Sequence, residues 1–108
     1  MSKITTATTG VGTTETTIYT CPTGKETTIS RFRITGTKDV TDLKLKYYNS
    51  SSSSIIALVD SGVINSGDTV SYISNSNTLT MNPTDYLSAL SNVDNSLDII
   101  VTYEETDA

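Results

Sequence analysis

Few side chains of this sequence could carry out covalent catalysis. The chain has no His and one Cys, whereas serine-type triads and cysteine-protease dyads rely on an imidazole base. Cys21 could act only with an unusual base such as Lys25, and the favoured interpretation of Cys21 is a small, semi-buried residue at a strand end. A single Cys without His also disfavours a zinc site. We therefore expect a non-enzymatic protein without a cofactor.

Two further patterns could bind ions, and both have simpler interpretations. Asn92, Asp94, Asn95 and Asp98 could offer oxygen ligands to Ca²⁺. Their segment lacks the central Gly and terminal Glu of a helix-loop-helix calcium loop, and Asn and Asp are common in turns, so we expect turns there. Residues 24–26, Gly-Lys-Glu, resemble the end of a phosphate-binding loop, but they lead into a predicted strand rather than a helix.

The positive charges form the most informative pattern. Arg31, Arg33, Lys44 and Lys46 account for four of the seven cations, and all fall at outward positions of two strands that are adjacent in the sequence. If those strands pair, the four cations form one basic face, with Tyr48 beside the lysines. Tyr is enriched in protein interfaces. These five residues are the candidate partner-facing residues.

Two interpretations of this basic face remain open. The first, which we favour, is cross-strand ion pairing with acids such as Asp98 or Glu104 on a neighbouring strand. The second is an electrostatically complementary docking face for an acidic partner.

Length and composition indicate one small domain. The chain has 108 residues, 35% of them hydrophobic, and a formal net charge of −5. The acidic balance argues against non-specific binding to nucleic acid. No apolar run approaches the roughly 18 residues that a membrane-spanning segment needs. No signal peptide is evident at the N-terminus, and a lone Cys implies no oxidising compartment, so we expect synthesis in a cytosol.

Hydrophobic residues alternate with polar ones along much of the chain, which is typical of strands. Phe32 is the strongest core prediction, and residues 50–54, five serines, predict a loop. The pattern favours an antiparallel β-sandwich or a jelly-roll-like fold without a substantial helix. About eight short strands are expected, near residues 18–21, 27–36, 43–48, 55–59, 70–72, 79–81, 86–90 and 96–104.

The predicted domain spans residues 13–105. Residues 1–12 are rich in Thr and Gly without apolar periodicity, which predicts an N-terminal arm. Residues 106–108 form a short acidic tail.

Three segments resemble small β-sandwich virion proteins of tailed bacteriophages. Residues 18–25, Ile-Tyr-Thr-Cys-Pro-Thr-Gly-Lys, are similar to a turn that opens a strand in that family. Residues 79–88 resemble its turn with Asn and Asp, although Thr84 stands where Gly is common. Residues 97–101 are similar to its closing strand, so the resemblance covers roughly residues 14–104.

The resemblance implies a non-enzymatic structural protein of the virion, made in the cytoplasm of a bacterial host. Its first implied role is capsid decoration (a cement protein), with the major capsid protein or other virion proteins as partners. A homo-oligomer, a trimer by analogy, is also implied. A neck, tail or head-fibre component is the alternative within the virion. A carbohydrate- or calcium-binding sandwich is the alternative from another class.

Overall fold

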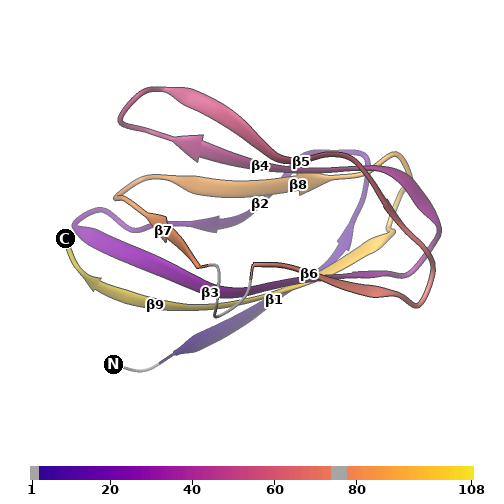
Figure 1. Cartoon of the computed structure of the whole chain (residues 1–108), viewed down its shortest axis with the longest axis horizontal. Helices are drawn as coiled ribbons and strands as arrows, with labels where there is room; N and C mark the ends of the chain where they lie inside the picture. Colours follow the sequence, from indigo (N-terminus) through magenta and orange to yellow (C-terminus); the bar gives the residue numbers. More distant parts are fainter. Residues whose placement is uncertain (1–2, 74–77) are drawn as a thin grey trace.

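The computed structural model describes residues 3–73 and 78–108, which form two antiparallel sheets packed face to face (Figure 1). The predicted β-sandwich is confirmed, with nine strands and no helix among the described residues, and therefore no helix there that could cross a membrane. Residues 74–77, a Ser- and Asn-rich segment between the strands predicted at 70–72 and 79–81, lie outside the described residues. The strands are β1 (Ile4–Val11), β2 (Thr16–Thr20), β3 (Lys25–Gly36), β4 (Val40–Asn49), β5 (Ser54–Ile64), β6 (Thr69–Ile73), β7 (Leu79–Met81), β8 (Tyr86–Leu90) and β9 (Leu97–Asp107).

The strands pair in a nested order. In the five-stranded sheet the order is β1-β9-β3-β6, with β7 also pairing with β3, and in the four-stranded sheet it is β2-β8-β4-β5. The pairs β1–β9, β2–β8, β3–β6 and β4–β5 thus enclose one another, as in a long hairpin folded over on itself. This is the organisation of a jelly roll. It leaves β5 as one edge of the four-stranded sheet.

Both ends of the chain belong to the five-stranded sheet. In place of the expected arm at residues 1–12, Ile4–Val11 form strand β1, which pairs with β9 from Ile4–Tyr103 to Val11–Leu97. Thr is β-branched and suits a strand. Because these residues show no alternation of apolar and polar side chains, the sequence did not predict β1. The expected tail also differs, because β9 continues to Asp107. The sandwich therefore extends beyond both limits of the predicted 13–105 domain.

The core lies between the sheets and consists of the side chains that the alternation places inward. Phe32, the strongest core prediction, is completely buried. Predicted inward residues of β3, β4 and β9 are all buried, namely Ser30, Phe32, Ile34, Leu43, Leu45, Tyr47, Leu97, Ile99, Val101 and Tyr103. The strand predicted at residues 86–90 is confirmed as β8.

Gly36 marks the point where the chain leaves the five-stranded sheet. A Cβ atom at this position would lie 2.8 Å from the carbonyl oxygen of Asn65, so a larger residue would push the two segments apart. Residues 37–39 then carry the chain across to the four-stranded sheet, where β4 begins. This crossing determines where the predicted basic residues lie.

Candidate interaction surface

The structure separates the five candidate partner-facing residues. Arg31 and Arg33 belong to β3 in the five-stranded sheet, whereas Lys44, Lys46 and Tyr48 belong to β4 in the four-stranded sheet. Because the sheets pack face to face, their outward side chains point in opposite directions. The prediction of one basic face is therefore wrong. The physical reason is that β3 and β4 follow one another in sequence but do not form a hairpin.

The two lysines are held by acids near them. The Lys44 Nζ lies 2.8 Å from Asp60 Oδ1 and 3.3 Å from Asp42 Oδ1, and the Lys46 Nζ lies 3.1 Å from Glu15 Oε1. Hydrogen bonding to Asp60 raises the pKa of Lys44, and the same bond lowers the pKa of Asp60. Ion pairing is thus the interpretation that holds for the lysines, with partners other than the expected Asp98 and Glu104.

Arg31 and Arg33 are exposed and form no ion pair with any residue in the described ranges. In the sheet register, Arg31 is opposite Thr102, and Arg33 is opposite Ile100 on one side and Ser71 on the other. Ile100 is itself an exposed hydrophobic residue. This outer face therefore combines two guanidinium groups with one apolar side chain.

The ring of Tyr48 stacks on the ring of a neighbouring residue. Tyr48 and Tyr86 are directly opposite on β4 and β8, and their rings stack with centroids 4.8 Å apart and planes inclined by 19°. Such cross-strand aromatic pairs stabilise a sheet. Tyr48 thus stiffens the outer face of the four-stranded sheet.

The largest group of exposed hydrophobic residues lies along β5, the edge of the four-stranded sheet. Ile55, Ile56, Leu58 and Val63 are exposed to 60%, 48%, 40% and 62%. The strand predicted at residues 55–59 is confirmed, but its exposure was not predicted. A run that is apolar on both faces, directly after five serines, was the available signal.

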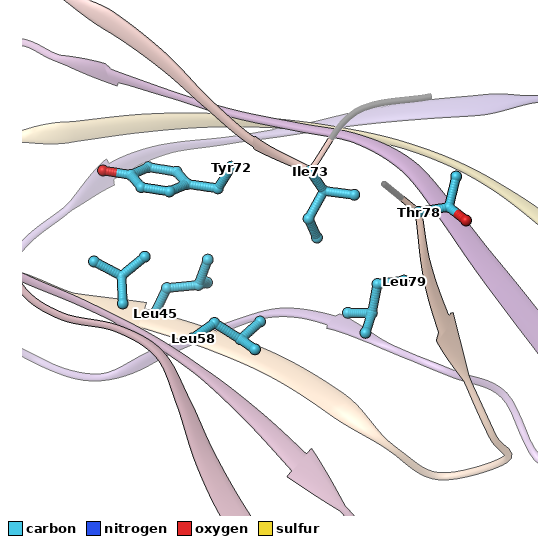
Figure 2. A pocket seen from close by; sticks show the side chains of 7 residues that line it. Leu45, Leu58, Tyr72, Ile73, Thr78 and Leu79 are labelled. Atoms are coloured by element: carbon cyan, nitrogen blue, oxygen red, sulfur yellow. The ribbon is translucent and has the colours of Figure 1, made fainter. Parts of the chain in front are cut away.

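A cavity of about 310 Å³ opens next to this edge (Figure 2). Leu45, Leu58 and Val59 of the four-stranded sheet face residues of β6 and β7 across it. The far side is lined by Tyr72, Ile73, Thr78 and Leu79. Five of its seven lining residues carry purely apolar side chains, while Tyr72 and Thr78 add hydroxyl groups.

The buried carboxylate of Asp85 joins the loop between β4 and β5 to the turn between β7 and β8. Asp85 has no exposed surface; its Oδ1 accepts hydrogen bonds from the backbone N (2.8 Å) and Oγ (2.9 Å) of Ser50. Its Oδ2 accepts from the backbone N of Asn82 at 3.0 Å and from the Tyr47 hydroxyl. Burial alone would raise the pKa of Asp85, but these hydrogen bonds outweigh it and hold the pKa below its usual value.

The candidate calcium ligands are used within the fold. Asn92 Oδ1 accepts hydrogen bonds from the backbone N of Thr41 (3.3 Å) and of Asp42 (3.2 Å). Asp94 accepts one from Thr13, and Asp98 accepts one from the backbone N of Gly10. Across residues 3–73 and 78–108, no three His, Cys, Asp or Glu side chains cluster as a metal ion would require.

Cys21 is buried at the end of β2, against the start of β3. Its Sγ lies 3.2 Å from Thr27 Oγ1 and donates to the carbonyl oxygen of Lys25 at 3.3 Å. The Lys25 ammonium points elsewhere, forming an ion pair with Asp107 at 2.6 Å. Cys21 and Lys25 thus do not form a nucleophile–base pair.

No protein-family model matches the chain, and no curated protein matches it. Among solved structures, the chain is similar to one from the disulfide-linked pili that Bacillus endospore appendages form. The TM-score is 0.56 at 13% sequence identity, and the likeness covers 98% of this chain and 85% of the other. At this identity the likeness shows a shared fold.

Proposed function

We propose that this chain is a non-enzymatic structural subunit that acts through protein–protein contacts in an assembly of many copies. The observation that carries this proposal is the exposed apolar edge β5. Monomeric proteins usually blunt a sheet edge, because its free backbone groups invite another strand. Large exposed apolar groups on such an edge are typical of a surface that is covered in the working assembly.

The assembly that we propose is a bacteriophage virion, in which the chain decorates the capsid and binds the major capsid protein. The resemblance of residues 14–104 to small virion proteins supports this setting. A capsid-bound decoration protein would be made in the host cytoplasm and would reach its final location on the particle. Neck, tail and head-fibre positions are the alternatives within the virion.

A fibre subunit is the second candidate function. It is favoured by the fold shared with a chain from Bacillus pili. Those pili are disulfide-linked, whereas the one Cys of this sequence, Cys21, is buried. Copies of this chain would therefore have to join by contacts other than a disulfide at Cys21.

Immunogold electron microscopy on particles and fibres purified from the source organism tests the proposal. Label spread over the capsid surface is the expected result. Label confined to a neck or tail favours the alternative virion positions, and label along free fibres favours the second candidate. Protein found only in the soluble fraction, with no labelled assembly, would refute a structural role.

A further inference from the structure

Strand β5 is protected unevenly along its length. Its C-terminal half carries the charged Asp60, a left-handed residue at Ser61 (φ 63°) and Gly62, and its pairing with β4 is interrupted by register shifts. Charges and bulges of this kind discourage the addition of another strand. Residues 54–57 pair with β4 in regular register, and the first register shift falls at Leu58, between Ala57 and Val59. The part of β5 that is open to pairing is therefore this first half.

The other sheet edges are less suited to pairing. Strand β2 has five residues and a bulge, β6 has five residues, and β7 has three. Strand β1 has eight residues, four of them Thr, and ends in a bulge. Residues 54–58 thus combine a register with β4 that is regular through Ala57 with large exposed apolar side chains at Ile55, Ile56 and Leu58.

The side chains of residues 54–58 alternate regularly between the two faces of the sheet. Ile55 and Ala57 are opposite the outward residues Tyr48 and Lys46 of β4. Ile56 is opposite the inward Tyr47, and Leu58 lines the cavity. Residues that are directly opposite in an antiparallel pair share a face, so any added strand has to respect this alternation.

We propose that residues 54–58 pair antiparallel with the same residues of a second copy, about a two-fold axis at Ile56. This axis places Ile56 opposite Ile56 of the other copy on the inward face. It places Ile55 opposite Ala57 on the outward face and Ser54 opposite Leu58 on the inward face. Every pair keeps the required face, and the two four-stranded sheets become one continuous sheet.

Residues 54–58 offer two copies of this acidic chain a surface where like charges do not meet. The chain carries a net charge of −5, so two copies repel one another unless they meet at an uncharged surface. Residues 54–58 are uncharged, and the nearest charge on β5, that of Asp60, is already paired with Lys44.

The proposal deepens the proposed function and rests on it, because it names the copy-to-copy contact of the structural subunit. An isologous contact of this kind closes a dimer, and further growth into an assembly would use other surfaces.

Sedimentation equilibrium of the wild-type chain and two lysine variants tests the pairing. We expect a concentration-dependent species of twice the 11.6 kDa chain mass. Ile56→Lys should return it to a monomer, since the two-fold axis would bring two ammonium groups together. Val63→Lys is the matched control, since Val63 is equally exposed on β5 but outside the paired half, and it should stay dimeric. A wild-type chain that remains monomeric at high micromolar concentration overturns the proposal.

Disulfide trapping tests the register, and it does not require that the fold remain stable with a lysine in β5. Directly opposite residues of antiparallel strands have Cα atoms about 4.5–5.5 Å apart, within the range that a disulfide bridges. Under mild oxidation Ile56→Cys should be trapped almost completely as a dimer, whereas Val63→Cys should not, and the buried Cys21 should stay unreacted. If β5 bound a different edge, the chain would form an oligomer but Ile56→Cys would not cross-link. That result would refute the two-fold register.

These outcomes are separable from those of the immunogold experiment. A monomeric chain that labels a virion or fibre refutes the self-pairing and leaves the structural role standing. A trapped dimer that labels no assembly supports the pairing and refutes the structural role.

Discussion

Replacing Asp85 with alanine is expected to lower the free energy of unfolding by about 3–5 kcal/mol at neutral pH. The change removes the acceptor of four hydrogen bonds. The Ser50 hydroxyl retains a second acceptor, the carbonyl oxygen of Pro83 at 3.1 Å. The Tyr47 hydroxyl and the backbone N–H groups of Ser50 and Asn82 lose their acceptor, and each such donor costs at least about 1–1.5 kcal/mol.

Urea and thermal denaturation followed by circular dichroism measure this loss. For a domain of this size, about 4 °C per kcal/mol is expected, so the midpoint temperature should fall by about 12–20 °C. Asp85→Asn keeps the shape of the side chain, but the new amide NH₂ group faces other hydrogen-bond donors. This variant should lower the free energy of unfolding by roughly half as much as Asp85→Ala. Asp39→Ala is the matched control, since Asp39 accepts a bond from the backbone N of Ser66 at 2.9 Å but is exposed, and it should change the midpoint little.

The Asp85 contribution should also depend on pH in a defined direction. Because the pKa of Asp85 is lowered in the folded chain, the carboxylate stabilises the fold above its unfolded pKa of about 3.9. That contribution is lost as pH falls through the lower folded pKa. The stability difference between wild type and Asp85→Asn should thus be constant from about pH 5 to 8 and shrink below about pH 4. Two results would contradict the role assigned to Asp85. One is a loss of less than about 1 kcal/mol in the free energy of unfolding for Asp85→Ala, and the other is a stability difference between wild type and Asp85→Asn that stays the same at acid pH.

Three further predictions concern tyrosine ionisation, backbone strain and a surface ion pair. Burial raises the pKa of Tyr19 and Tyr47, and the hydrogen bonds from Tyr19 to Glu105 and from Tyr47 to Asp85 raise it further. The free energy of unfolding should therefore be retained below about pH 10 and fall above it. In denaturation scans, Tyr47→Phe should make this fall at alkaline pH smaller. Thr84→Gly should raise the free energy of unfolding in urea by about 0.5–1 kcal/mol, because Thr84 has a φ of 71° that Gly adopts without strain; a less stable variant would contradict this. Lys44→Ala should lower the urea midpoint only slightly, because the side chains of Lys44, Asp42 and Asp60 are all partly open to solvent.

Local alternation predicted much of the sandwich. From Leu43 to Tyr47 in β4 and from Leu97 to Tyr103 in β9 every second residue is apolar, so both the strands and their buried faces could be derived before any pairing was known. Strand β1 escaped prediction because half of its residues are Thr, without alternating apolar residues, and its order comes from backbone pairing with β9. Phe32 was predictable because it is the largest apolar side chain on an alternating strand.

The interaction surface was less predictable, since it depends on which strands are neighbours. Arg31 and Lys44 were each correctly placed as outward, but the crossing at residues 37–39 puts them on opposite sheets. Asp85 was recognisable only as part of a turn, and its partners Tyr47 and Ser50 lie some 35 residues away in the sequence.

Local patterns along the chain are enough to derive the all-β class, the positions of most strands and the inward faces of β3, β4 and β9. These features follow from local sterics and the period of two in a strand, and the lack of His leaves Cys21 without the imidazole base of ordinary thiol catalysis. Three other features appear only once the strands are paired and packed: β5 is an edge, the basic residues are divided between two faces, and Asp85 is buried. Each depends on contacts between segments far apart in the chain, and a pattern of neighbouring residues does not specify which segments meet.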